Sequence, residues 1–89
     1  MRELLEKVIE RFGKKHQLVV AMEEMAELQK ELSKAIRGRQ DINHITEEIA
    51  DVEIMLEQLK IIFECSADVD IWKSAKLDRV IKRLERDEL

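Results

Sequence analysis

The sequence predicts an all-α fold, an antiparallel bundle of about four helices that is assembled as a homo-oligomer. Three features indicate this class: the 89 residues contain no proline, 40% of them are charged, and apolar residues recur at spacings of three and four. A chain of this length builds one small domain at most, so we expect residues 1–89 to form a single helical domain. The lone Cys65 excludes a disulfide scaffold.

The first two helices are each followed by a glycine. The spacing predicts a helix from about Arg2 to Phe12, with Gly13 at its C-terminal cap, and a second from about His16 to Arg37, followed by Gly38. We call the apolar positions of a long helix that step by three and four its seam, and expect the seam to be buried between the helices. The seam of the second helix is Leu18, Ala21, Met25, Leu28, Leu32 and Ala35.

The third helix is predicted from about His44 to Glu64, after a loop in which Asp41 or Asn43 is the N-cap. The fourth is predicted from about Val69 to near the C-terminus, with Asp68 as its N-cap. The seam of the third helix is Ile45, Ile49, Val52, Leu56, Leu59 and Phe63.

Short connections make neighbouring helices antiparallel, so the second and third helices are expected to form a hairpin about 30 Å long. Both also carry apolar residues outside their seams, which a single hairpin cannot cover. We therefore expect a homodimer or homotetramer. These additional residues are Val19, Met22, Ala26, Ile36, Ile54, Met55, Ile61 and Ile62.

The net charge of −4 is unevenly distributed, since ten acids and four bases lie between Glu23 and Glu57. An acidic excess argues against a nucleic-acid partner. No apolar run reaches the length of a membrane span, and the N-terminus lacks the apolar core of a signal peptide. With a single cysteine, these features lead us to expect a cytoplasmic protein with no membrane partner.

The acids of the two long helices form paired motifs. Glu24 and Glu27 are three residues apart, as are Glu48 and Asp51, and this spacing places each pair on one helix face beside the seam. Closing the hairpin is expected to place Asp51 opposite the Lys30 region, so that four or five carboxylates converge, Glu31 being the fifth. Crowded carboxylates stay ionised only with a cation, and all-oxygen ligation suits Mg²⁺, Mn²⁺ or Ca²⁺.

The alternative is structural. Glutamates at these spacings are common on solvated helix faces, and Glu31 has Lys30 and Lys34 as neighbours with which to pair. On this interpretation the chain is a helical oligomer without a site.

A basic stripe lies on the fourth helix, where Trp72, Lys76, Arg79 and Arg83 fall within about 60° of one another. Cations hold phosphates, and an indole offers a plane on which a ring can stack, so the stripe suits an anionic ligand that carries a ring. The alternatives are that the cations complement the helix dipole and that Trp72 belongs to the core.

Together these motifs resemble the MazG-like, all-α nucleoside triphosphate pyrophosphohydrolases, and the small size is most similar to the short, phage-type members. The family motif is Glu-x-x-Glu, a spacer, then Glu-x-x-Asp. Here it reads Glu24-Met-Ala-Glu27 and Glu48-Ile-Ala-Asp51, with twenty residues between. The resemblance spans roughly residues 8–83. The spacer is long for the family's shortest members, so the loop around Arg39 is expected to protrude or to touch another subunit.

The resemblance implies a homo-oligomeric enzyme that uses Mg²⁺, with Mn²⁺ as the alternative ion. Such enzymes hydrolyse a nucleoside triphosphate, NTP or dNTP, between the α and β phosphates to give monophosphate and pyrophosphate. It implies that the metal ligands are Glu24, Glu27, Glu48 and Asp51.

The substrate contacts are a looser match. Lys76 and Arg79 match the family's basic positions in type, while Gln17 and Trp72 are added from helix geometry. Glu23, Glu31 and Glu47 are spare acids, one of which would position the attacking water. Two other functions stay open: a catalytically silent nucleotide- or metal-binding regulatory module, and an enzyme like phosphoribosyl-ATP pyrophosphohydrolase.

Overall fold

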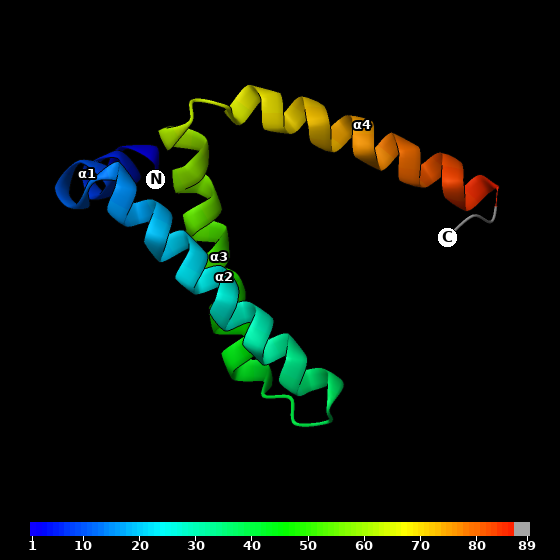
Figure 1. The fold of residues 1–89 in the computed structure, drawn as a ribbon. Coiled ribbons are helices and arrows are strands. Elements are labelled where there is room, and N and C mark those ends of the chain that lie inside the picture. The colour runs from blue at the N-terminus through cyan, green and yellow to red at the C-terminus, as the bar shows by residue number, and fades with distance from the viewer. Residues whose placement is uncertain (87–89) are drawn as a thin grey trace.

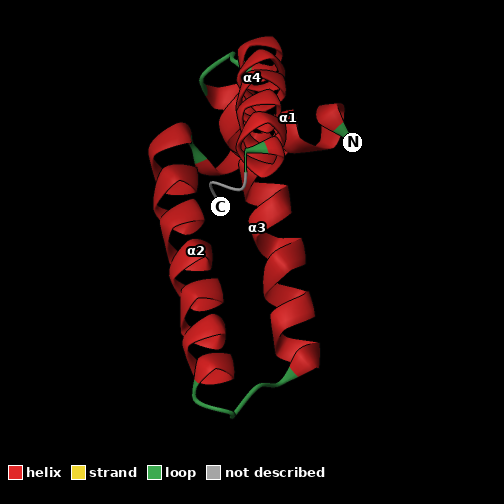
Figure 2. Ribbon diagram, turned by 90° about the vertical axis from the view of Figure 1, so that its right-hand side faces the viewer, coloured by secondary structure: helices red, strands yellow, loops and turns green. Residues whose placement is uncertain are grey.

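A computed structural model describes residues 1–86, which contain four helices and no strand (Figure 1, Figure 2). The helices are α1 (Arg2–Phe12), α2 (Lys14–Ile36), α3 (Ile42–Ile62) and α4 (Ser66–Glu85). The all-α prediction is confirmed. Three helices begin two or three residues earlier than the sequence suggested.

The N-caps explain two of these boundaries. The Asp41 side chain accepts a 3.2 Å hydrogen bond from the backbone N–H of His44, so Asp41, and not Asn43, caps α3. The prediction that Asp68 caps α4 is wrong, because Cys65 holds that position and Asp68 lies inside the first turn.

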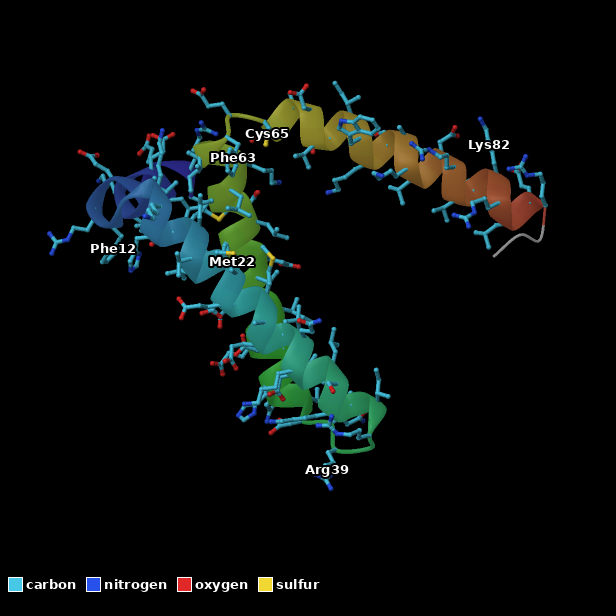
Figure 3. All side chains as sticks on the ribbon, in the orientation of Figure 1. Phe12, Met22, Arg39, Phe63, Cys65 and Lys82 are labelled. Carbon is cyan, nitrogen blue, oxygen red and sulfur yellow. The ribbon has the colours of Figure 1, made fainter. Side chains whose placement is uncertain are left out.

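Helices α2 and α3 form the expected antiparallel hairpin, and α1 packs across its open end (Figure 1). Helix α1 buries Leu5 and Ile9 there, whereas Phe12 is exposed and stacks on the ring of His16, with centroids 5.7 Å apart. At the other end, Arg39 lies exposed at the tip of the loop, which protrudes as the sequence suggested (Figure 3).

The interior of the hairpin is more polar than the sequence predicted. The buried residues of α2 are Gln17, Ala21 and Glu31, and those of α3 are Met55 and Gln58. An amide pair and a carboxylate therefore occupy positions at which an apolar core was expected.

The expectation that both seams are buried is wrong. Ala21 is buried, and about half of the other seam residues are half-buried. The remaining seam residues, which are exposed, are Met25, Leu32, Ile49, Leu56 and Phe63. The two helices are rotated so that the polar stripes beside their seams face each other.

Helix α4 leaves the end of α3 and projects away from the hairpin (Figure 1). Among the described helices it contacts α3 alone, and it contributes no buried residue. In the described part of the chain, no helix has both the length and the apolar character needed to cross a membrane.

Candidate metal centre

Three of the four predicted metal ligands converge on one point. Glu24 of α2 and Glu48 and Asp51 of α3 each offer a carboxylate oxygen, and these oxygens all lie within 4.8 Å of one another. All three side chains are half-buried. One side of the cluster comes from each arm of the hairpin, so the site depends on how α2 and α3 are paired.

That pairing follows a repeat of seven residues. Along α2 the facing positions are Gln17, Glu24 and Glu31, and along α3 they are Gln58, Asp51 and His44. Seven residues make almost two full helical turns, so positions seven apart stay on one face. The carboxylates occupy the middle step of this polar interface.

The predicted register is wrong by six residues, because Asp51 lies opposite Glu24 and not opposite Lys30. Helix α3 begins two residues earlier than expected, which shortens the loop and accounts for only part of this shift. The buried Gln17 and Gln58 side chains then lock this register through a 2.7 Å hydrogen bond.

Burial and neighbouring negative charges act on the carboxylates of this site. Burial raises the pKa of Glu24 above its ordinary value, and the nearby charges of Asp51 and Glu48, with hydrogen bonding to both, raise it further. The Oε2 atom of Glu48 is buried and has no hydrogen-bond partner among the described residues. An acceptor buried without a donor costs free energy, which a bound cation would relieve.

The donor set fits a hard divalent cation. Three carboxylates supply only oxygen ligands, which suit Mg²⁺ or Mn²⁺, and one of them, Glu48, has a buried oxygen without a hydrogen-bond donor. Mg²⁺ needs few protein ligands because it keeps several waters, so three carboxylates are sufficient.

The fourth predicted ligand, Glu27, is exposed on α2 and does not belong to the group of three. Glu23 and Glu47 are also exposed, and each precedes a member of the cluster in sequence. Successive side chains on a helix point about 100° apart, so Glu23 and Glu47 flank the cluster and do not belong to it.

Glu31 lies in a different environment. Its side chain is only 6% exposed and accepts a 3.2 Å hydrogen bond from Lys34 Nζ, as the sequence suggested. Its other oxygen is 4.0 Å from His44 Nδ1. Glu31 thus belongs to the end of the hairpin near the loop.

Two of the predicted substrate contacts, Gln17 and Trp72, have partners within the chain. Gln17 is 4% exposed and is held by Gln58 and by His16 Nδ1, 2.8 Å away. Trp72 is exposed on α4, with Lys76 Nζ 5.7 Å from its ring centroid, which is a cation–π contact. Arg79 is exposed on the same helix.

Within one chain the structure does not bring the basic stripe to the carboxylates. Helix α4 makes no contact with α2 among the described residues and points away from the hairpin (Figure 1, Figure 3). Lys76 and Arg79 therefore do not face Glu24, Glu48 and Asp51 in a single copy.

Gln58 and His44 are the members of the polar interface that sequence reasoning missed. Both lie seven residues from Asp51, in opposite directions, so the repeat itself was visible in the sequence. Comparison of the chain with known families, with curated proteins and with solved structures finds no match.

Proposed function

We propose that this protein is a Mg²⁺-dependent nucleoside triphosphate pyrophosphohydrolase that cleaves NTP or dNTP between the α and β phosphates. The observation that carries the proposal is the convergence of Glu24, Glu48 and Asp51 from two helices within 4.8 Å. The type of reaction is inferred from the resemblance of the two acidic motifs to those of the MazG-like enzymes. Mn²⁺ is the alternative ion.

In this proposal Glu24, Glu48 and Asp51 hold the ion, and each must be ionised to do so. When bound, Mg²⁺ neutralises phosphate charge and lowers the pKa of a coordinated water. The raised pKa of Glu24 works against ion binding at low pH, because a proton then competes for the same oxygen.

The exposed acids beside the cluster have a second role. Glu47 and Glu23 are exposed and precede Glu48 and Glu24 in sequence, and in this proposal one of them orients a water and accepts its proton. The water oxygen bonds to one phosphorus of the α–β anhydride, and the bond from that phosphorus to the bridging oxygen breaks. Glu31, already paired with Lys34, is less suited to this role.

Phosphate and base contacts are assigned to the basic stripe, Lys76, Arg79 and Trp72. Because α4 points away from the carboxylates, these contacts require another copy of the chain, in a homodimer or homotetramer. The assignment of the metal ligands does not depend on this part of the proposal.

The test is a panel of NTPs and dNTPs incubated with purified protein and Mg²⁺, with pyrophosphate release as the readout. We expect at least one nucleotide to be turned over, and Glu48→Gln to reduce release by 100-fold or more, on the order expected when a charge-stabilising group is removed. Glu53→Gln is the matched control, since Glu53 is an exposed acid of α3 outside the cluster. Absence of turnover of every nucleotide by correctly folded protein would overturn the proposal.

A silent nucleotide- or metal-binding module is the second candidate, favoured by the separation of the cations from the carboxylates within one chain. Mg²⁺-dependent nucleotide binding without pyrophosphate release distinguishes it. Adding phosphoribosyl-ATP to the panel separates the third candidate, an enzyme like phosphoribosyl-ATP pyrophosphohydrolase.

A further inference from the structure

The chain exposes far more surface than a compact monomer of its mass. Its accessible surface is 7269 Å², whereas a folded monomer of 10.5 kDa is expected to expose about 5,400 Å². Its radius of gyration is 16.3 Å, against about 12 Å for a compact domain of 89 residues. Each chain therefore exposes about 1,900 Å² more accessible surface than a compact monomer of the same mass.

Part of this surface is the apolar stripe of α4. At about 100° per residue, Leu77, Val80, Ile81 and Leu84 share one face of the helix. Leu77 is 60% exposed and Leu84 is 58% exposed, and no described residue of α4 is buried. Such a helix loses conformational entropy when it forms, without the burial of an apolar face that normally compensates for this loss.

The rest of the excess exposed surface is one face of the hairpin of α2 and α3. Relative to the positions that face the other helix, the apolar seam is rotated by about 70° on α2 and by about 120° on α3. Because the helices are antiparallel, both rotations lead to the same face of the hairpin. In Figure 2 α2 and α3 lie side by side, and α4 projects toward the viewer from the end of the hairpin. The exposed members of this apolar face include Met25, Leu32, Ile49, Leu56 and Phe63.

Charge favours pairing between these two surfaces. Helix α3 carries five acids and one base, a balance of −4, while residues 73–86 carry six bases and two acids, a balance of +4. Opposite charges of equal size steer two copies toward each other and fix their orientation.

Helix α4 is held in its projecting position by the chain that precedes it. The backbone N–H of Cys65 donates to Lys60 O at 3.0 Å and that of Glu64 donates to Ile61 O at 3.2 Å, and Glu64 adopts the left-handed conformation with φ of 52°. This cap closes α3 and aims α4 outward, which leaves the hairpin face free for another chain.

We propose that the chain forms a two-fold dimer in which α4 of each copy lies along the apolar face of the hairpin of the other copy. Covering the excess surface of two chains would bury about 3,800 Å², within the range of obligate homodimers. In this arrangement the apolar stripe of α4 packs on the apolar face of the partner's hairpin, and the basic end of α4 lies beside the acidic α3 of the partner. This arrangement does not rest on the proposed enzymatic function.

The first test is the mass in solution, measured by light scattering after size exclusion at micromolar concentration. We expect twice the chain mass of 10.5 kDa, and we expect Leu77→Glu to give a monomer. Ala75→Glu makes the same charge change on the opposite side of α4 and should leave the dimer intact. A monomeric wild-type chain, or a Leu77→Glu variant with unchanged mass, would overturn the proposal.

The second test locates the contact, in a Cys65→Ser background. Chains with Leu77→Cys are mixed with chains with Leu56→Cys and oxidised, and we expect a disulfide between the two chains at least five times more abundant than with Ala75→Cys in place of Leu77→Cys. A chain that carries both cysteines and closes only within itself would show that α4 folds back on its own hairpin, which would overturn the exchange.

Discussion

The Nε2 atom of Gln17 donates a 2.7 Å hydrogen bond to the Oε1 atom of Gln58, and this bond joins α2 to α3 inside the hairpin. Gln58 is 3% exposed, and its own Nε2 lies 3.5 Å from the sulfur of Met55. Two amides at this depth satisfy each other only when the helices are in one register. The carboxylate cluster lies one heptad further along the hairpin, so this register also fixes the positions of its three side chains.

Gln58→Leu should therefore destabilise the protein although it adds apolar surface. The substitution leaves the Gln17 amide buried without its partner, at a cost of about 1–3 kcal/mol in the free energy of unfolding. Chemical denaturation measures the change as a lower midpoint with an unchanged slope.

The double variant Gln17→Leu, Gln58→Leu is the control, because no amide is then left unpaired. We expect it to be close to the wild type in stability, or above it. Equal destabilisation by the single and the double change would show that the amide pair does not determine the register.

The raised pKa of Glu24 predicts an unusual dependence of stability on pH. Glu24 binds its proton more tightly in the folded chain than in the unfolded chain, whose value is near 4.5. Between 4.5 and the raised value the folded state holds more protons, so the contribution of Glu24 to stability falls as pH rises through that window.

Glu24→Gln should remove this loss. Removing the charge relieves both the partial burial of the carboxylate and the like-charge repulsion, which at a partly exposed site is worth about 0.5 kcal/mol and corresponds to a rise in Tm of roughly 2–4 °C at pH 7 without added divalent ions. Scanning calorimetry from pH 4 to 8 measures it, and Glu23→Gln, one residue away and exposed, should change Tm little. A lower Tm for Glu24→Gln at pH 7 would contradict this account.

The helices could be predicted from the sequence, as could Asp41 as one of two candidate caps and the three central carboxylates among four candidate ligands, because each depends on local spacing or on side-chain chemistry. The rotation of α2 and α3 could not. Each helix carries an apolar stripe and, about a quarter-turn away, a polar stripe with the same heptad period, so periodicity alone does not say which of them faces the partner helix. Gln17 was accordingly assigned to a ligand, although its partner is Gln58.

The position of α4 was beyond sequence reasoning for a related reason. Its apolar and basic stripes were visible, but the direction in which it leaves α3 depends on the conformation of Glu64. A short connection suggested a closed antiparallel neighbour, whereas the structure has a projecting helix.

The Asp41 cap gives a prediction that is independent of any site. Asp41→Ala removes the acceptor for the backbone N–H of His44 and should cost about 1 kcal/mol in the free energy of unfolding. Asp41→Asn keeps a capping oxygen and should retain most of the stability, with thermal denaturation as the measurement. Asn43→Ala is the control within the first turn of α3, since Asn43 is exposed and does not cap the helix.

The last prediction compares Glu48 with Glu27, which the sequence motif treats as equal ligands. Mg²⁺ at 100 times its dissociation constant should stabilise the folded chain by about 2.7 kcal/mol. Glu48→Gln should abolish most of this gain, because the Glu48 carboxylate lies in the cluster and has a buried oxygen without a donor. Glu27→Gln should reduce it less, because Glu27 is exposed and outside the cluster. Thermal denaturation with Mg²⁺ or with EDTA measures both, and equal losses in the two variants would mean that Glu27 rotates into the site when the ion binds.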